Sequence, residues 1–147
     1  MEKATPRDSR WYVRHYIGQA RDLMIKARQK ELNPYHITPQ QASILIFLYH
    51  LGHKATLSEL SKDTGRGINT LSPQMTGMEK DGLVKKGREV PKSTLLSFEL
   101  TEKGREIAQS TMRIRSVETI MAVLSEEERQ QMISMLQKII GKAEKFK

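Results

Sequence analysis

The stretch NTLSPQMTGMEKDGLV, residues 69–84, decides the fold of this chain. Leu71, Met75 and Met78 recur at intervals of four and three residues, which is the spacing of one apolar face on a helix. Small polar side chains occupy most of the remaining positions, and Gly82 is typical of a residue that ends a helix. The stretch therefore predicts a short helix with its apolar face against a core and its polar face outside.

Pro73 constrains where this helix begins, because proline lacks a backbone donor and crowds the carbonyl of the residue four positions earlier. If Asn69 is the N-cap, Pro73 is the fourth helical residue and the crowded carbonyl belongs to the cap itself. We therefore expect the helix to begin just after Asn69. Gly77 could allow the DNA backbone to approach the helix closely, or it could be needed only for packing inside the protein. The sequence does not distinguish the two.

The segments on either side predict a winged helix-turn-helix. Thr56 and Glu59 fit a capping box that starts a short helix ending near Gly65. After Gly82, LVKK is typical of a strand, GREVPKS of a turn-rich loop and TLLSFEL of a second strand, so a β-hairpin with a basic tip is expected. In the second strand, one face should carry Thr94, Leu96, Phe98 and Leu100, and the other Ser97 and Glu99. The second helix of such a motif lies in the DNA major groove.

Two further helices are predicted before this unit. Ser9 is expected to cap the first, whose apolar stripe is Val13, Ile17, Ala20, Met24 and Ala27. Thr38 followed by Pro39 predicts the start of the second, because proline suits the first helical position. Its sequence, QQASILIFLYHLG, is apolar on nearly all sides, which predicts a central, buried helix.

Two more helices are predicted after the hairpin. Thr101 is expected to cap one with heptad-like positions Ile107, Ser110, Ile114, Val117, Met121 and Leu124. Ser125 and Glu128 fit a second capping box. The helix that follows is expected to bury Met132, Ile133, Leu136, Ile139 and Ile140.

The composition favours a nucleic-acid partner. The 147 residues carry a formal net charge of +8, which suits a polyanion, with nucleic acid ahead of an anionic membrane surface. The absence of cysteine excludes disulfides, thiolate metal sites and thiol redox sensing. The first residues lack the apolar core of a signal peptide, and the longest apolar run, residues 42–49, is too short to span a bilayer. We therefore expect a soluble, cytoplasmic protein without a membrane partner.

No residue constellation indicates catalysis, so we expect neither enzyme activity nor a cofactor. His50 and His53 are three residues apart, but no acidic residue flanks them, which argues against a metal site. The acidic run SEEER is typical of a helix start. The turn TGRG, residues 64–67, lacks the preceding strand and the remaining pattern of a phosphate-binding loop.

Three pieces of sequence together resemble the MarR family of bacterial transcriptional regulators: LSEL at 57–60, MEKDGLV at 78–84 and LTEKG at 100–104. They occur in the order and at the spacing of the family, and the resemblance covers about residues 36–110. It implies a mostly α-helical fold with a small β-hairpin wing. Within a single domain, 1–147, residues 37–100 would form the winged helix-turn-helix core, and residues 9–32 and 102–145 the dimerisation region.

The resemblance also implies a homodimer that reads a pseudo-palindromic operator, with half-sites about 10 base pairs apart. The segment TLSP, residues 70–73, most resembles the organic-peroxide-sensing branch of the family. Members of that branch sense through a cysteine, which this chain lacks, so their mechanism is not carried over.

DNA contacts are expected from the polar face of the predicted helix and from the wing. Contacts to bases or nearby phosphates are expected from Asn69, Thr70, Ser72, Gln74 and Thr76, with Pro73 stiffening the docking end. Contacts mainly to the DNA backbone are expected from Lys80, Lys85, Lys86, Arg88 and Lys92. Family wings commonly carry an acid–arginine pair shortly before the second strand. The corresponding positions, Lys92, Ser93 and Thr94, lack that pair, so sequence choice by the wing is not implied. Entry of Arg88 or Lys92 into the minor groove stays open as the alternative to phosphate contacts.

A small aromatic or lipophilic effector is implied by the resemblance as well, bound between the dimer body and the winged part. Its candidate contacts are Trp11, Tyr12, Arg14, His15, Tyr16 and His36. Aromatic residues on an amphipathic first helix equally fit a dimer core. The function expected is a dimeric, sequence-specific DNA-binding regulator, a repressor rather than an activator. The alternative is a winged-helix protein-interaction module without sequence-specific DNA binding.

Overall fold

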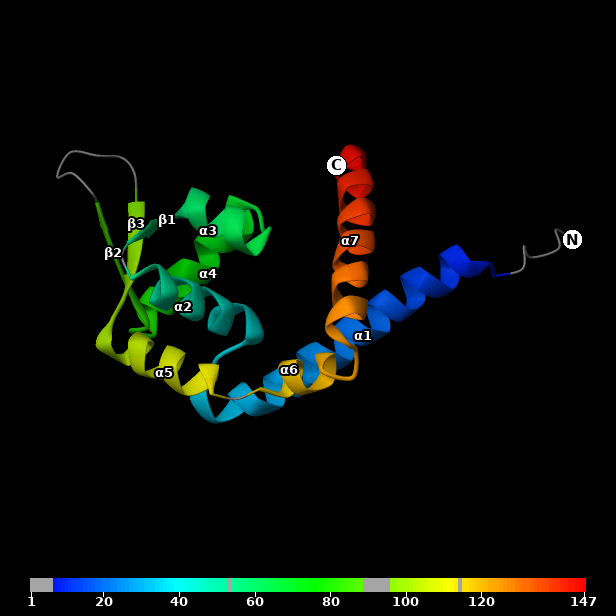
Figure 1. Cartoon of the computed structure of the whole chain (residues 1–147). Helices are drawn as coiled ribbons and strands as arrows, with labels where there is room; N and C mark the ends of the chain where they lie inside the picture. The colour runs from blue at the N-terminus through cyan, green and yellow to red at the C-terminus, as the bar shows by residue number, and fades with distance from the viewer. Residues whose placement is uncertain (1–6, 53, 89–95, 114) are drawn as a thin grey trace, which may run out of the picture. The chain divides into compact units, whose positions relative to one another are not determined.

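The computed structural model describes residues 7–52, 54–88, 96–113 and 115–147. The chain divides into two compact units, Met1–Ile114 and Arg115–Lys147. The first unit contains α1 (Ser9–Leu32), η1 (Asn33–Tyr35), α2 (Pro39–Leu51), β1 (Ala55–Thr56), α3 (Leu57–Thr64), α4 (Ile68–Lys80), β2 (Val84–Arg88), β3 (Leu96–Leu100) and α5 (Glu102–Met112). The second contains α6 (Ser116–Met121), α7 (Glu126–Ala143) and η2 (Glu144–Phe146). The mostly helical, winged architecture expected from the sequence is confirmed (Figure 1).

The core of the first unit lies around α2, which α3, α4, α5 and the small sheet surround (Figure 1). The prediction of a central helix is confirmed, because α2 buries Ala42, Ile44, Leu45 and Leu48. Thr38 caps it in a capping box with Gln41. The start and end of α3 are also as predicted: Thr56 and Glu59 form its capping box, and Gly65 ends it at φ 70°.

Asp8, and not Ser9, caps α1. The Asp8 carboxylate accepts hydrogen bonds from the backbone N–H groups of Arg10 at 2.8 Å and Trp11 at 3.3 Å. The Arg10 guanidinium binds the same carboxylate and holds the pKa of Asp8 below its usual value. The predicted cap was wrong by one residue because aspartate and serine serve equally well as N-caps.

The sheet has three strands in the order β1–β3–β2, so the predicted two-stranded hairpin was incomplete. As the central strand, β3 is flanked on both edges, and Ser97 lies between Thr56 of β1 and Gly87 of β2. Ser97 is fully buried and donates a hydrogen bond to the Gly87 carbonyl at 3.2 Å, whereas Leu96 is 37% exposed. Burial therefore does not follow polarity at these two positions, because the unpredicted strand β1 covers the edge beside Ser97. Phe98 is buried as predicted.

The start of α5 is attached to the turn after α4. Thr101 caps α5, as predicted, by accepting a hydrogen bond from the Gly104 N–H at 3.1 Å. Its hydroxyl donates to the Gly82 carbonyl at 2.5 Å, and its backbone N–H donates to the Leu83 carbonyl at 3.2 Å. Gly104 packs so closely against Leu83 that no side chain fits between them. These contacts fix the end of α4, the start of β2 and the start of α5 to one another.

One long helix was expected after Thr101, but the structure ends α5 at Met112 and begins α6 at Ser116. Arg28 of α1 donates a hydrogen bond to the Thr111 carbonyl at 3.2 Å. That carbonyl would otherwise accept the N–H of Arg115 if the helix continued. A contact between residues 83 positions apart therefore competes with helix continuation, and no local sequence pattern reveals it. The heptad position Ile114 lies outside the described residues.

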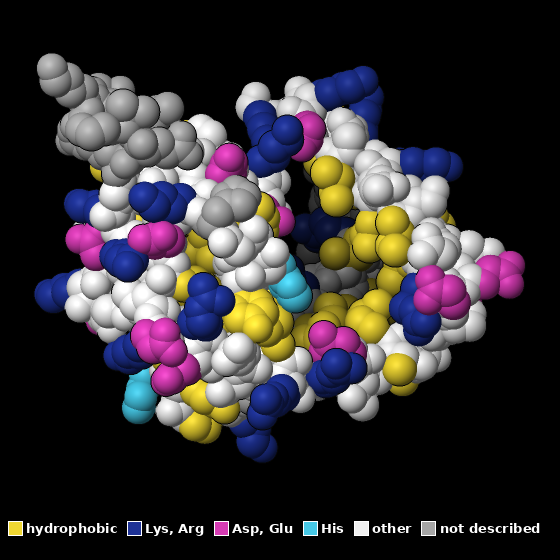
Figure 2. Space-filling view, turned by 60° about the vertical axis from the view of Figure 1, so that its left-hand side comes forward, with side chains coloured by type: hydrophobic (Ala, Val, Ile, Leu, Met, Phe, Trp, Pro, Cys, Tyr) yellow, Lys and Arg dark blue, Asp and Glu magenta, His cyan; other side chains and the backbone are white. Residues whose placement is uncertain are grey.

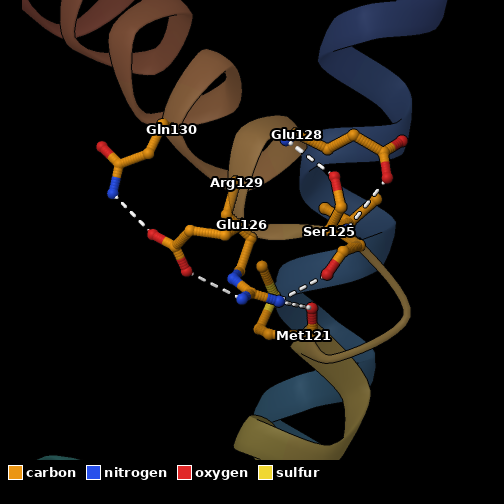
Figure 3. A network of polar contacts seen from close by, with 7 residues as sticks. Met121, Ser125, Glu126, Glu128, Arg129 and Gln130 are labelled. Atoms are coloured by element: carbon orange, nitrogen blue, oxygen red, sulfur yellow. Dashed lines mark hydrogen bonds and ion pairs between the residues drawn. The ribbon is translucent and has the colours of Figure 1, made fainter.

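In the second unit, polar contacts join α6 to the first turn of α7 (Figure 3). Ser125 and Glu128 form the predicted capping box, and the hydrogen bond from the Ser125 N–H lowers the pKa of Glu128. Arg129 donates to the carbonyls of Met121 and Leu124 and pairs with Glu126 at 2.8 Å. Hydrogen bonds from Gln130 and then Arg129 lower the pKa of Glu126.

The apolar positions of α7 are not buried within the chain, contrary to the sequence expectation. Met132, Ile133, Ile139 and Ile140 are exposed, and Leu136 is half-buried. The periodicity correctly marks one apolar face of the helix, and within the described residues this face stays largely exposed. Val13 and Ile17 of the α1 stripe are likewise exposed.

Candidate nucleic-acid interface

Helix α4 begins two residues earlier than expected. Gly67, in an extended conformation, is its N-cap, and its carbonyl accepts hydrogen bonds from the N–H groups of Thr70 at 3.0 Å and Leu71 at 3.1 Å. Asn69 is therefore the second helical residue and not the cap. Asparagine suits an N-cap because its side chain can accept a hydrogen bond, whereas here the cap is a glycine that makes no side-chain hydrogen bond.

This start changes the position of Pro73, which becomes the sixth helical residue instead of the fourth. The carbonyl that it crowds belongs to Asn69, inside the first turn, and not to the cap. That carbonyl also loses the N–H partner that another residue at position 73 would provide. Because Asn69 and Pro73 are both exposed, water can solvate the free carbonyl.

The two faces of α4 are sharply divided. Leu71, Met75 and Met78 are fully buried, which confirms the predicted inner face. At about 100° of rotation per residue, the side chains that point directly away from this inner face belong to four residues. These residues, called the outer face below, are Asn69, Pro73, Thr76 and Lys80, and all four are exposed.

Thr70 and Ser72 are exposed on the two flanks of the outer face. The Thr76 hydroxyl donates to the Ser72 carbonyl at 3.0 Å, which orients the hydroxyl oxygen along the helix surface. The polar groups at this surface are therefore short, exposed and held by the helix itself. Their size and chemistry suit contacts to base edges and phosphates.

Gln74 differs from its neighbours because it is half-buried and lies on the flank of α4 toward α2. Its side-chain amide meets that of Gln40, in the first turn of α2, at 3.4 Å. When the Gln40 amide is turned so that its oxygen faces Arg66, it accepts hydrogen bonds from both terminal guanidinium nitrogens, at 2.8 and 2.9 Å. The hydrogen bond from Gln74 belongs to the opposite orientation of the Gln40 amide. These three side chains line a pocket of about 640 Å³.

The C-terminal end of α4 is locked by backbone hydrogen bonds. Gly82 has φ 73°, and its N–H donates to the Glu79 carbonyl at 3.0 Å, while the Leu83 N–H donates to the Met78 carbonyl at 2.9 Å. This pair of bonds is the Schellman arrangement, and it confirms that Gly82 ends the helix. The chain therefore enters β2 in a fixed direction, which positions the β2–β3 hairpin, called the wing, beside α4.

The described lysines of the wing are exposed but paired. Lys85 lies 3.5 Å from the carboxylate of Glu99, and Lys86 lies 3.9 Å from that of Glu79. On the face shown in Figure 2, basic side chains are interspersed with acidic ones and do not form one continuous basic surface. Exposed ion pairs of this kind are weak, so a phosphate can replace the carboxylate at little cost.

The rest of the predicted wing contacts fall beyond these lysines. Arg88 is the last residue of β2, and its side chain is not among the described parts of the chain. Lys92, Ser93 and Thr94 lie outside the described residues, as does His53.

The aromatic residues predicted to hold an effector cluster near the start of α1. Trp11 stacks on His15 with ring centroids 4.8 Å apart, and Tyr12 stacks on Tyr16 at 6.3 Å. His36 follows η1 beyond the other end of α1, with φ 56°, and is not part of this cluster. Among the described residues that line the 640 Å³ pocket, none belongs to the six predicted effector contacts.

Gln40 and Arg66 are site residues that the sequence did not predict. Gln40 is 34 residues from Gln74, and only the folded chain brings their amides together. Arg66 lies in the turn TGRG, which was compared with a phosphate loop and not with a pocket. No local signal indicated either residue, because Gln40 is exposed and its partners lie far along the chain.

The described part of the chain contains no helix with the length and hydrophobicity needed to cross a membrane. In the same residues, no three histidine, aspartate or glutamate side chains gather where they could bind a metal ion.

The fold is that of solved MarR-family structures. AbsC from Streptomyces coelicolor, a MarR family transcriptional regulator, is 22% identical; the match covers 97% of this chain and 99% of that chain with a TM-score of 0.82. MepR from S. aureus in complex with DNA is 21% identical, with 93% and 99% covered and a TM-score of 0.74. The organohalide-sensing regulator RdhR, bound to 2,4-dichlorophenol, is 23% identical, with 95% and 88% covered and a TM-score of 0.80.

No protein-family model and no curated protein matches the sequence. The structural matches nevertheless extend over nearly the whole chain, and the family they represent is not enzymatic. The resemblance seen in the sequence is thus confirmed for the fold, and the chain has the MarR-like winged-helix fold of DNA-binding transcriptional regulators.

Proposed function

We propose that this protein is a cytoplasmic MarR-family regulator that binds double-stranded DNA as a homodimer and represses transcription. Residues 37–100 form its DNA-reading core, and residues 9–32 and 102–145 its dimerisation region. The observation that carries this proposal is the division of α4 into a fully buried apolar face and an exposed polar outer face. A solved relative with the same fold, MepR, is bound to DNA.

In this proposal α4 lies in the major groove, where side chains on its outer face and flanks meet base edges. Asn69 and Thr76 are the uncharged polar residues of the outer face, and Thr70 and Ser72 reach the groove from either side. Pro73 stiffens the docking end. Gln74 reaches the DNA only if its amide leaves Gln40, so its contact to DNA and its contact in the pocket compete.

The wing and the end of α4 supply contacts to the DNA backbone. Lys80 is exposed at the last turn of α4, and Lys85 and Lys86 are exposed on β2. Arg88, Lys92, Ser93 and Thr94 complete the proposed set. Such contacts raise affinity and salt dependence without choosing a sequence, so the proposal assigns specificity to α4.

In a homodimer, the second subunit would cover the exposed apolar residues of α1 and α7. Ile133 and Ile140 of α7 are about half exposed, as is Val13 of α1. A helical face with several such residues costs free energy in water and is typical of a subunit interface. A two-fold symmetric dimer would place two α4 helices on half-sites about 10 base pairs apart.

Effector control is the remaining part of the proposal. RdhR has this fold and is bound to 2,4-dichlorophenol, which supports a small aromatic or lipophilic ligand for this protein too. The contacts expected from the sequence are Trp11, Tyr12, Arg14, His15, Tyr16 and His36. A ligand releases DNA only if it binds the non-DNA conformation more tightly than the DNA-bound one.

A gel-shift titration of the DNA upstream of the protein's own gene, with excess random competitor DNA, tests the proposal. A selection from random DNA supplies the operator if this region is not the target. The proposal predicts a complex that survives competitor and contains two protomers. Binding that competitor abolishes completely would favour the alternative, a winged-helix module that binds another protein.

A further inference from the structure

The side-chain amide of Gln40 has two possible donors, Arg66 and Gln74, for its single oxygen. In one orientation this oxygen accepts hydrogen bonds from both terminal guanidinium nitrogens of Arg66, at 2.8 and 2.9 Å. In the opposite orientation it accepts a hydrogen bond from the Gln74 side-chain nitrogen, at 3.4 Å. The two contacts exclude each other, so the orientation of one amide decides whether the Gln74 NH₂ group is held against α2.

Arg66 is the stronger of the two donors. Its guanidinium is charged and gives two short hydrogen bonds, whereas Gln74 gives one neutral bond that is longer than the usual range of about 2.7–3.2 Å. Charge-assisted hydrogen bonds are about twice as strong as neutral ones. The orientation toward Arg66 therefore prevails. Gln40 then offers Gln74 a donor in place of an acceptor, so the Gln74 NH₂ group is available to another acceptor.

The turn between α3 and α4 holds Arg66 in place for this contact. Gly65 ends α3 at φ 70°. The Ser61 hydroxyl donates to the Arg66 carbonyl at 2.6 Å, and the Arg66 N–H donates to the Thr64 hydroxyl at 3.3 Å. Both backbone groups of Arg66 are thus bonded to the end of α3, so its half-buried side chain leaves the turn from a fixed point.

The start of α2 leaves the Gln40 amide able to turn. Thr38 and Gln41 form the capping box of this helix, and the Gln41 side chain accepts the Thr38 N–H at 3.0 Å. Gln40 is exposed and takes no part in this capping box. Its amide can therefore face either donor without disturbing the start of the helix.

Gln74 lies on the same flank of α4 as Thr70, because the two residues are four positions apart. Thr70 is exposed, whereas Gln74 is half-buried. Once its NH₂ group is released from Gln40, the long and flexible Gln74 side chain can turn toward the surface beside Thr70. In the major groove, an NH₂ group can donate to guanine N7 or O6, to adenine N7 or to thymine O4.

We propose that Arg66 is a positioning residue for DNA recognition: it occupies the Gln40 oxygen and so makes the Gln74 amide available to a base. Arg66 acts through Gln40 and needs no contact with that base. This inference rests on the proposed function, because it assigns a control to the same surface of α4. Specificity at one base pair of each half-site then depends on a side chain in the turn before α4.

The first test measures how the effect of Gln74→Ala depends on Arg66. Fluorescence anisotropy at one salt concentration gives the ratio of affinities for a selected operator and for random DNA. In the unaltered chain, Gln74→Ala should lower this ratio about fivefold or more, as expected for a base contact. In an Arg66→Met background the same change should have almost no effect, because the Gln40 oxygen now holds Gln74. Adding Gln40→Ala to that background should restore the loss.

Two further variants separate this mechanism from a loss of charge. Lys62→Met removes a positive charge from the last turn of α3, four residues before Arg66. Whatever its effect on affinity, it should leave the loss caused by Gln74→Ala at its original size. Arg66→Lys keeps the charge without the fork of donors and should give an intermediate loss. Recovery on adding Gln40→Ala also shows that the Arg66→Met variant is folded.

The second test needs no DNA. ¹⁵N NMR spectra of the full chain show the side-chain NH₂ groups of glutamines, and the alanine variants of Gln40 and Gln74 identify the two signals. Arg66→Met should shift both signals, because Gln40 loses its charged donor and the Gln74 NH₂ group gains the Gln40 oxygen. Adding Gln40→Ala to Arg66→Met should return the Gln74 signal toward its position in the unaltered chain.

The proposal is overturned if Gln74→Ala lowers the affinity ratio equally with and without Arg66, or leaves it unchanged in the unaltered chain. An equal loss would point to a direct contact between Arg66 and the DNA backbone. The proposal is also overturned if Arg66→Met leaves both amide signals in place. Failure to select any DNA site would instead contradict the proposed function, while the NMR signals would still decide which donor the Gln40 oxygen accepts.

Discussion

Replacing Gly104 by alanine should destabilise the protein, although alanine is the better helix former. A Cβ atom at Gly104 would lie 2.0 Å from the Leu83 carbonyl oxygen, 3.0 Å from its carbon and 3.3 Å from a methyl group of Leu100. The Leu83 carbonyl cannot easily move, because it accepts a hydrogen bond from the Thr101 N–H at 3.2 Å. In addition, the Leu83 N–H donates a hydrogen bond to the Met78 carbonyl. The substitution therefore forces α5 away from the turn after α4.

The expected loss in the free energy of unfolding is the sum of opposing contributions. Alanine gains about 1 kcal/mol over glycine in a helix. Forcing atoms into a packed site costs about 1–3 kcal/mol, and a backbone obstacle places the cost at the upper end. Moving α5 also weakens the Thr101 cap and its bond to Leu83, at about 1 kcal/mol each. The net loss should be about 2–4 kcal/mol, which lowers Tm by about 5–15 °C for a protein of this size.

Urea unfolding followed by circular dichroism, at one fixed protomer concentration, measures this loss. Gly77→Ala is the matched control, because it places the same methyl group in α4 with no atom within 4 Å. It should raise the free energy of unfolding by about 0.5–1 kcal/mol. If Gly104→Ala is as stable as the unaltered protein, or if both variants shift in the same direction, the reasoning about the close backbone approach is refuted.

Three other predictions concern DNA binding and the α7 cap. Asn69→Ala should weaken binding to a selected operator by about 1–3 kcal/mol and leave binding to random DNA nearly unchanged in fluorescence anisotropy; equal losses would contradict a base contact. Lys85→Ala should weaken both kinds of binding about equally and reduce the salt slope by about one, and an unchanged slope would argue against a phosphate contact. The pKa of Glu128 is lowered by the Ser125 N–H, so its contribution to stability is present above the usual value of 4.5 and is lost as the pH falls below it. Glu128→Gln keeps a capping oxygen without the charge, so Tm should fall less steeply below pH 4.5 than in the unaltered chain; an identical fall would refute the assignment.

Local sequence signals were sufficient for much of the fold. The capping boxes at Thr56 and Ser125 each depend on residues three positions apart, so the pattern of the chain contains the whole interaction. The inner face of α4 could be predicted for the same reason, since Leu71 and Met75 lie one turn apart. The polar outer face could be predicted too, because it consists of the residues that point away from that inner face.

The errors arose where distant segments meet. Strand β1 has only two residues and exists because β3 pairs with it, and this pairing buries Ser97. The break after α5 depends on Arg28, far away in the sequence. The contact between Gln40 and Gln74, and with it the pocket, also requires the folded chain. At Gly67 the cap has no side chain to reveal it, so the start of α4 was misplaced.

Methylation interference on a DNA site selected by the protein tests the central claim, that the outer face of α4 reads the major groove. Methyl groups on guanine N7 lie in the major groove, whereas those on adenine N3 lie in the minor groove. We expect guanine N7 methylation to block binding at two symmetric positions about 10 base pairs apart. Interference confined to adenine N3, or failure of the protein to select any site, would contradict the account.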